Sequence, residues 1–203
     1  MELFGCGCVG FEWKSVNDDS DWNTVAQAQA GDETAFAELV RRYEHRIVQF
    51  CYRMTGSAQD AEDLAQESFI RLYRHLHRLT PKAKFSTLLY GIARNLALNA
   101  VRDAGRRARM IAPPPDNARD IRSGDRRPDE WAHLKELDAM IHEGLQALSP
   151  AHREILVLRE FNGLDYDAIA RIIRCRKGTV RSRLARAREQ LRIRIEQAGG
   201  KAV

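Results

Sequence analysis

The sequence of 203 residues contains no long apolar run, few aromatic residues and few cysteines. A transmembrane helix needs about 20 consecutive apolar residues, so we expect no membrane insertion. The mildly apolar start of the chain is interrupted by Glu2, Glu12 and Lys14 and has no basic leader before it, which argues against a signal peptide. These absences predict a cytoplasmic protein.

The four cysteines fit a reducing compartment and do not form a recognisable metal site. Cys6 and Cys8 stand as a Cys-Gly-Cys pair, and no further Cys or His follows at the spacing of a zinc site. We therefore expect no metal and no cofactor. A redox- or metal-responsive role of this pair stays open.

Signatures of catalysis are also absent from the sequence. It has no glycine-rich phosphate loop, no nucleophile-elbow motif and no paired histidine and carboxylate constellation. We therefore predict that the chain is not an enzyme.

The charge that is present is unevenly distributed. Residues 18–67 hold eleven acids against four arginines, whereas residues 174–194 hold nine bases against Glu189 alone. Such asymmetry indicates one partner that is a protein and another that is a nucleic acid.

Apolar residues recur at helical spacing through most of the chain, and no strand-like alternation occurs. The prediction is an all-α fold with two small helical domains, residues 21–105 and residues 131–197. A flexible N-terminal tail, 1–20, precedes them. Residues 106–130, with three consecutive prolines and seven arginines, read as a flexible linker between the two domains.

Capping residues mark where several helices begin. Gly31-Asp32 predicts a turn and a cap, Ser57 opens a second helix, and Asp165 caps a short one. The expected helices are 24–46 with a break near Gly31, 57–77, 85–102, 131–147, 150–161, 166–173 and 178–196.

Two short helices joined by a tight turn at residues 174–177 predict a helix-turn-helix, whose second helix enters the major groove. With Val180, Leu184 and Leu191 turned inward, an arginine-rich face remains outside. Arginine pairs bidentately with guanine edges, and Ser and Thr bond bases or phosphates. A solvated basic helix is the alternative. The candidate DNA contacts are Lys177, Thr179, Arg181, Ser182, Arg183, Ala185 and Arg186.

Three segments, taken together, resemble one protein family. They are "DAEDLAQESFIRLYRHL", "FSTLLYGIARNLALNAVRD" and "LREFNGLDYDAIARIIRCRKGTVRSRLARAREQL". In this order and separation they resemble the extracytoplasmic-function sigma factors of the sigma-70 family, which direct bacterial RNA polymerase to promoters. The resemblance covers about residues 24–105 and 131–196.

The resemblance implies a contact with core RNA polymerase along the first segment and promoter contacts along the others. The polymerase contacts would be Asp60, Asp63, Gln66, Glu67 and Arg71. The single strand of the −10 element would be held by Lys82, Lys84, Phe85, Tyr90, Arg94, Asn95 and Asn99. The C-terminal helix-turn-helix would read the −35 element in duplex form. A core position is the alternative for Phe85.

Three residues depart from the family pattern. Leu88 replaces a common tryptophan, Gly91 stands where a basic residue is usual, and Ala185 replaces a bulkier or polar side chain. We expect Gly91 to weaken strand binding. The family also implies inhibition by an anti-sigma factor. A conventional helix-turn-helix repressor or activator, which would bind a palindromic duplex without polymerase, is the competing hypothesis.

Overall fold

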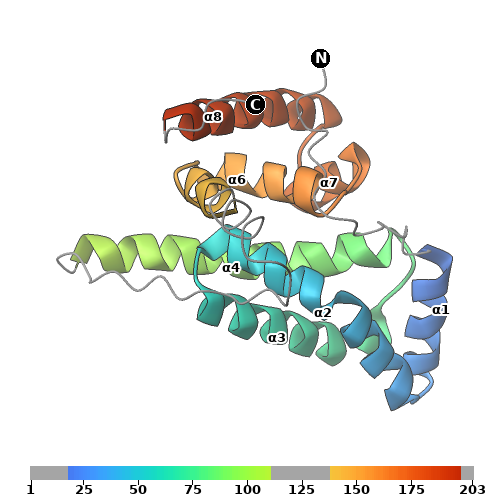
Figure 1. The fold of residues 1–203 in the computed structure, drawn as a ribbon. Coiled ribbons are helices and arrows are strands. Elements are labelled where there is room, and N and C mark those ends of the chain that lie inside the picture. Colours follow the sequence, from blue (N-terminus) through green and yellow to red (C-terminus); the bar gives the residue numbers. More distant parts are fainter. Residues whose placement is uncertain (1–17, 111–137, 198–203) are drawn as a thin grey trace, which may run out of the picture.

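The computed structural model of the chain describes residues 18–110 and 138–197 (Figure 1). These residues form helices and turns and contain no strand, which confirms the all-α prediction. None of the helices in the two ranges is both long and apolar enough to span a bilayer. We refer to residues 18–110 as the front bundle and to residues 138–197 as the rear bundle.

The front bundle consists of four α-helices and one short 3₁₀ turn. Asp32 caps α2 by accepting hydrogen bonds from the backbone of Thr34 and Ala35, and Ser57 caps α3 in the same way through Asp60. Both caps confirm the sequence prediction, because each supplies an acceptor to orphan backbone N–H groups. The elements are α1 (Asp18–Gln29), α2 (Glu33–Thr55), α3 (Ala58–Arg74), η1 (Leu76–Arg78) and α4 (Phe85–Met110).

Several helix boundaries of the front bundle differ from the prediction. Helix α2, predicted to end at residue 46, continues to Thr55, and α3, predicted to end at residue 77, ends at Arg74. Helix α1 begins at Asp18, so residues 18–20 of the predicted tail are helical. Helix α4 continues to Met110, so residues 106–110 of the predicted linker are helical as well. Ala104, Arg106 and Arg107 favour a helix, so α4 continues beyond its last buried residue, Ala97. The remainder of the predicted tail and linker lies outside the described residues.

The rear bundle begins in a helix described over residues 138–146. It continues with α6 (Pro150–Leu156), the π-helical turn η2 (Val157–Phe161), α7 (Tyr166–Ile173) and α8 (Lys177–Gln197). Asp165 caps α7 as predicted, by accepting from the backbone N–H of Ala168. Arg174 ends α7 in the left-handed conformation, with φ of 54°. It turns the chain into α8 and completes the predicted helix-turn-helix.

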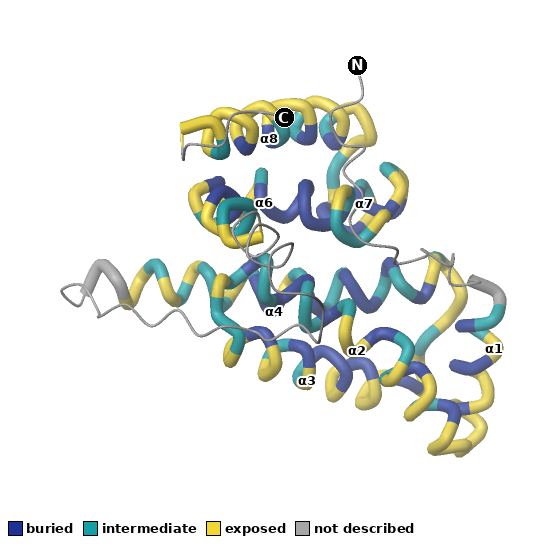
Figure 2. Tube along the Cα trace, in the orientation of Figure 1, coloured by how far each residue is buried: buried dark blue, intermediate teal, exposed yellow. Residues whose placement is uncertain are grey.

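The two bundles pack against each other and share one hydrophobic core. In Figure 1, α4 lies between α2 and α3 on one side and α6 and α7 on the other, and α8 forms the outermost layer. Figure 2 shows buried residues along α4 and exposed residues along the outer side of α8. The sequence predicted two domains but gave no sign that they would touch.

Candidate nucleic-acid interface

The outer face of α8 is a cationic surface of the rear bundle. Four residues of α8, Val180, Leu184, Ala187 and Leu191, are buried against the neighbouring helices. This stripe turns the opposite face of the helix to solvent. Of the predicted DNA contacts, Lys177, Arg181, Ser182, Ala185 and Arg186 are exposed, and Thr179 and Arg183 are half-buried.

Two of these cations are held in place by neighbouring residues of α7. The sequence did not predict these α7 contacts. Lys177 donates to the Asp167 carboxylate at 2.7 Å, which ties the start of α8 to α7. The Arg181 guanidinium lies over the Tyr166 ring, 5.9 Å from its centroid. Stacking on an aromatic face restrains a guanidinium while leaving its N–H groups available.

Further along α8, Arg188 and Arg192 are neutralised, whereas Arg194 forms no ion pair within the described residues. Arg188 donates to Glu160 at 2.6 Å, and Arg192 donates to both Glu189 and Glu196. The hydrogen bonds that Arg192 donates, first to Glu189 and then to Glu196, raise the pKa of Arg192. By contrast, Arg183 and Arg186 form no ion pair with any residue of the two described ranges. The unpaired cations are therefore concentrated in the first half of the helix.

A second candidate site is a cleft of about 430 Å³ between the loop after η1, α4 and α7. Lys82 and Asn95, both predicted to hold the −10 strand, line it, and the Trp22 indole donates to the Ala83 carbonyl oxygen at its edge. Arg78, Arg171 and Arg174 complete a wall without carboxylates. The sequence analysis missed these three arginines because they belong to segments far apart in the chain.

The other predicted strand contacts lie elsewhere. Lys84 and Asn99 are exposed outside the cleft, and Asn99 accepts a hydrogen bond from Arg102 at 3.1 Å. Phe85 is completely buried against Trp22 and Tyr43, because it is the first apolar residue of α4 to face the core. The structure therefore makes Phe85 a core residue and corrects its placement among the strand contacts.

Tyr90 and Arg94 point toward the rear bundle. Tyr90 is 3% exposed, and its hydroxyl accepts a hydrogen bond from Asn162 at 2.8 Å. Burial raises the pKa of Tyr90 to about 12. Arg94 forms a bidentate pair with Glu154. In this conformation neither side chain is available to a DNA strand.

A third surface is an apolar groove of about 860 Å³ between α2 and α3. Ile70 and Tyr73 are large hydrophobic side chains that remain 38% and 53% exposed on it. Phe36 packs edge-on against Tyr73, with 4.9 Å between ring centroids. An exposed apolar surface with a polar rim is typical of a protein-binding site. These three residues were not among the predicted polymerase contacts, because only polar side chains of α3 were chosen as contacts, whereas Ile70 and Tyr73 are apolar and Phe36 lies on α2.

The predicted polymerase contacts surround this groove only in part. Asp63 and Gln66 lie on its wall. Asp60, Glu67 and Arg71 belong to α3 but do not line the groove, and Arg71 donates to Glu67 at 2.7 Å. Glu44 and Glu62 also line the groove, beside Arg74, so its charged rim is mainly acidic and its floor is apolar.

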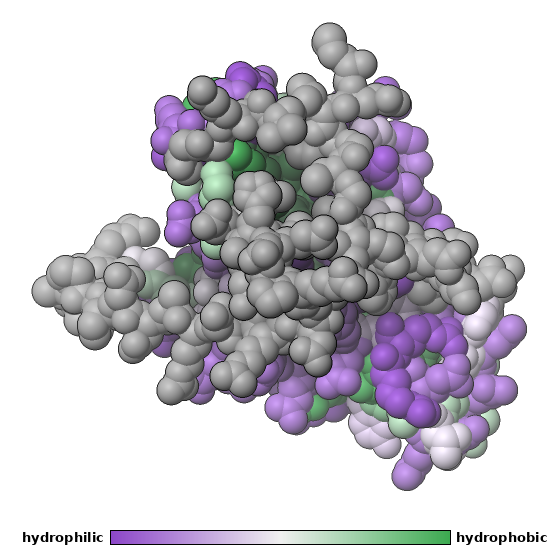
Figure 3. Space-filling view, in the orientation of Figure 1, coloured by the Kyte–Doolittle hydropathy of each residue, from purple (hydrophilic) through white to green (hydrophobic). Residues whose placement is uncertain are grey.

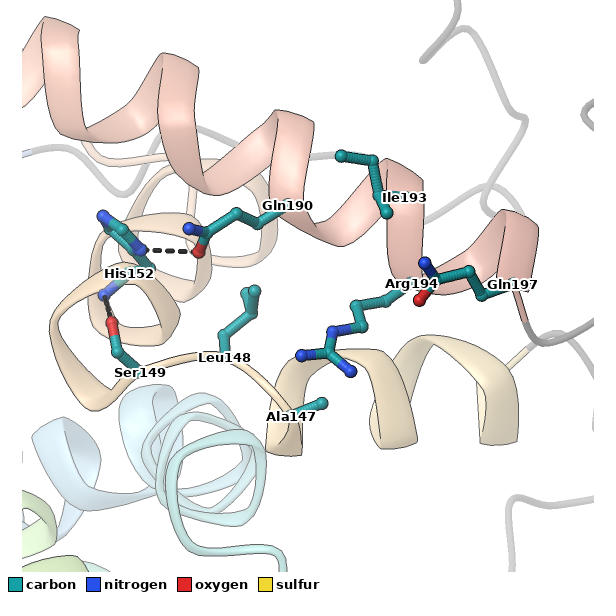
Figure 4. A pocket seen from close by; sticks show the side chains of 8 residues that line it. All are labelled: Ala147, Leu148, Ser149, His152, Gln190, Ile193, Arg194 and Gln197. Atoms are coloured by element: carbon teal, nitrogen blue, oxygen red, sulfur yellow. Dashed lines mark hydrogen bonds between the residues drawn. The ribbon is translucent and has the colours of Figure 1, made fainter.

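The rear bundle has a cleft of its own, about 670 Å³, with a mixed polar and apolar lining from α6, the turn before it and the second half of α8 (Figure 4). His152 and Gln190 are joined across it at 2.7 Å, and Leu148 and Ile193 line it. Figure 3 shows hydrophobic residues in the space between α8 and α6 and hydrophilic residues near the ends of α8.

The described residues show no arrangement for metal chemistry. Within residues 18–110 and 138–197, no three His, Cys, Asp or Glu side chains are grouped so that they would hold a metal ion. Burial raises the pKa of the Cys51 thiol to about 12, so this cysteine stays protonated. Cys6 and Cys8 lie outside the described residues.

Comparison with known proteins connects these surfaces to one family. The model for Sigma-70 region 2 matches residues 39–107, and the model for Sigma-70 region 4 matches residues 138–191. The chain is 39% identical over 189 residues to RNA polymerase sigma-H factor of Pseudomonas aeruginosa, covering 87% of this chain and 94% of the relative. It is 38% identical to ECF RNA polymerase sigma factor SigE of Mycolicibacterium smegmatis, covering 89% of this chain and 70% of SigE.

Solved structures agree at the level of the fold. The structure of CnrH in complex with the cytosolic domain of CnrY has a TM-score of 0.67 at 23% identity, covering 88% of this chain and all but 1% of that one. The sigma factor RpoE in complex with the anti-sigma factor NepR, from Bartonella quintana, has a TM-score of 0.63 at 21% identity, covering 79% of this chain and 96% of RpoE. The sequence relatives and family models show that the chain belongs to the extracytoplasmic-function sigma factors of the sigma-70 family, which direct promoter-specific initiation of transcription.

Proposed function

We propose that three separate surfaces divide the work of this sigma factor. The outer face of α8 reads duplex DNA at the −35 element through Arg181, Ser182 and Arg186, with Lys177, Thr179, Arg183 and Ala185 beside them. The cleft of Lys82 and Asn95 receives the unpaired strand of the −10 element. The α2–α3 groove binds core RNA polymerase.

The observation that carries this proposal is the division of α8 into two faces. One face is buried in the rear bundle, and the other presents unpaired arginines over its first half. The N-terminal part of a recognition helix contacts base edges, and its guanidinium groups form bidentate pairs with guanine. The paired cations Arg188 and Arg192 are suited to holding the helix in place and not to reading bases.

The front-bundle wall of the cleft supports strand binding because it combines the cations Arg78 and Lys82 with the amide of Asn95. Cations bind phosphates, and an amide such as Asn95 pairs with the edge of an unstacked base. Lys84 and Asn99, which are exposed beside the cleft, would follow the strand outward. Arg94 and Tyr90 would join the site when the rear bundle moves away from α4.

The groove supports protein binding because exposed aromatic and aliphatic side chains lie inside a charged rim. We propose that Asp60, Asp63, Gln66, Glu67 and Arg71 make polar contacts with polymerase around the apolar contacts of Ile70 and Tyr73. We also propose that an anti-sigma factor covers this groove, since RpoE of similar fold was solved with such a partner.

The regulatory role of the family leads us to propose that the chain itself catalyses no reaction. We also propose that it acts in the cytoplasm, where bacterial polymerase and promoter DNA are found. Both statements remain predictions from the sequence.

The decisive test is run-off transcription with purified core polymerase on a promoter library, with and without the protein. We expect new start sites that depend on the protein. Tyr73→Ala should reduce the affinity of the protein for core polymerase about tenfold, because a few aromatic hot-spot residues contribute most of the binding free energy of an interface. Ile193→Ala is the matched control, since it removes an exposed hydrophobic residue from α8.

The competing hypothesis makes the opposite prediction for the protein alone. Two weak DNA readers gain affinity when polymerase fixes their spacing, so the protein alone should bind promoters weakly. A strong footprint of the free protein on a palindromic duplex would contradict the proposal.

A further inference from the structure

The contact between the two bundles is built from polar groups as well as apolar ones. Gln146 donates to the Arg53 carbonyl oxygen at 3.1 Å, and the Arg53 guanidinium lies 4.4 Å from the centre of the Phe161 ring. Arg153 reaches into the front bundle and donates to the Met54 carbonyl oxygen. Tyr52 stacks on His142, with 4.6 Å between ring centroids.

A bidentate ion pair in this contact joins α4 to α6. Arg94 Nε donates to Glu154 Oε2 at 2.6 Å, and Arg94 Nη2 donates to Glu154 Oε1 at 3.2 Å. The two side chains are 16% and 4% exposed. A bidentate pair shielded from water is both stronger and more directional than a surface pair.

Tyr90 lies one helical turn before Arg94 and makes the second link. Its hydroxyl accepts from the Asn162 amide, and its ring packs edge-on against Phe50. Two of the residues expected to hold the −10 strand are thus turned to the rear bundle. The cleft itself carries Arg171 and Arg174 of α7 beside Lys82 and Asn95.

We infer that this conformation is a self-blocked form, in which the Glu154 carboxylate holds the guanidinium that a −10 strand phosphate would otherwise take. A carboxylate and a phosphate present similar pairs of anionic oxygens to arginine, so they compete for the same fork. The rear bundle and the melted strand therefore exclude each other from Arg94 and Tyr90. This inference rests on the proposed role of α4 in strand binding.

The block is reversible because its key contacts are replaceable. Opening exposes Glu154 and Asn162 to water, which hydrates both, and frees Arg94 for phosphate. A ligand that binds only the open form shifts the population toward that form. Polymerase, which holds the two promoter readers apart, would be such a ligand, and the closed form would limit unproductive DNA binding by the free protein.

The test compares Glu154→Gln with Glu160→Gln in the full chain. Both substitutions remove one negative charge from a carboxylate that binds an arginine, but the pair of Glu160 and Arg188 lies within the rear bundle. We expect Glu154→Gln to raise the radius of gyration measured by small-angle X-ray scattering. We also expect about fivefold to tenfold tighter binding of a −10 single-stranded oligonucleotide, measured by fluorescence anisotropy. Glu160→Gln should change neither quantity.

Asn162→Ala provides a second route to the open form if Glu154→Gln unfolds the rear bundle, which circular dichroism reports. It should expand the chain in the same direction but by less. An unchanged radius of gyration in both variants would overturn the inference, whatever happens to DNA affinity. Expansion without tighter strand binding would overturn the competition for Arg94 and would locate the failure in the proposed strand-binding role of α4.

Discussion

The front and rear bundles bury different kinds of side chain. In the front bundle, aromatic residues occupy the core: Tyr43, Phe50, Phe69, Phe85 and Tyr90 are all buried. In the described part of the rear bundle, every buried hydrophobic residue is aliphatic. Large rings in edge-on contact fill the space between long helices, whereas short helices at close approach leave room only for Ile, Leu, Val and Ala.

The same contrast extends to buried charge. The front bundle fixes α1 to α2 through Asp21, which is 1% exposed and accepts hydrogen bonds from Arg42 and Tyr43. The rear bundle uses Glu154 and Arg153 instead, and both reach the front bundle. Arg153 also donates to the carbonyl oxygens of Gln146 and Leu148 in its own bundle. Buried polar groups thus hold the front bundle together internally, whereas those of the rear bundle also hold it to its neighbour. This difference suits a rigid platform and a movable reader.

The largest effect is expected when Asp21, which fixes α1 to α2 in the front bundle, is removed. Asp21→Ala leaves the Tyr43 hydroxyl and one side of Arg42 without a partner. We expect the free energy of unfolding to fall by about 3 kcal/mol, the cost of removing one member of a buried pair. Urea denaturation followed by circular dichroism measures it. Asp103→Ala, which removes an exposed pair with Arg106, should cost less than about 1 kcal/mol.

The next prediction concerns DNA binding by the rear bundle. It compares an arginine of α8 without an ion pair in the described residues, Arg181, with one that has ion pairs, Arg192. Arg181→Ala should weaken −35 duplex binding by the polymerase complex by about 2 kcal/mol, because a base-edge guanidinium is lost. Arg192→Ala should have little effect, since Glu189 and Glu196 already neutralise Arg192. Electrophoretic mobility shift of the complex measures both. Equal losses would show that α8 binds DNA by charge alone.

A smaller effect on the free energy of unfolding is expected from a substitution in α4. Gly91 is in the helix, and a Cβ added there would meet no atom within 4 Å. Gly91→Ala should therefore raise the free energy of unfolding by up to about 1 kcal/mol, through lower entropy of the unfolded chain. Thermal unfolding measures the gain.

Substitutions of Gly91 also test whether a positive charge at this position of the cleft strengthens strand binding. Gly91→Lys should tighten binding of the −10 single strand, and Gly91→Gln, which gains the helix propensity without the charge, should not. If both variants bind the strand as the wild type does, the cleft is not the strand site.

The smallest expected effect is a pH dependence of the contact between bundles. Burial lowers the pKa of His142 below 6.5, with Arg53 and Arg153 acting in the same direction and Asp138 and Glu143 opposing them. Because the folded pKa is depressed, its contribution to stability is complete above pH 6.5 and is lost as the pH falls below that value. We expect a loss below about 1 kcal/mol between about pH 7.5 and about pH 5.5, since the ring is only half-buried.

The variant His142→Phe keeps a ring against Tyr52 but has no proton to gain. Its unfolding free energy, measured by urea denaturation at both pH values, should change less with pH than that of the wild type. A larger change in the variant would contradict the assignment.

The local structure of this protein was predictable because its signals are local. Asp32, Ser57 and Asp165 cap helices where the sequence predicted them, and α7 has the predicted bounds. Helix periodicity and capping involve residues within a few positions of each other, so the sequence displays them directly. The buried stripe of α8 followed from the same periodicity, and the family followed from three contiguous segments.

Only the tertiary structure decided which of the candidate side chains are available. Phe85 and Asn95 belong to the same helix, yet the first is completely buried and the second is exposed at a cleft. Arg94 and Glu154 form an ion pair although they are 60 positions apart in the sequence. Nothing in the sequence distinguishes them from other residues of opposite charge. The periodicity of each helix fixes which face is apolar, but the partner of that face depends on how helices from distant segments pack, and a single sequence contains no local signal of that packing.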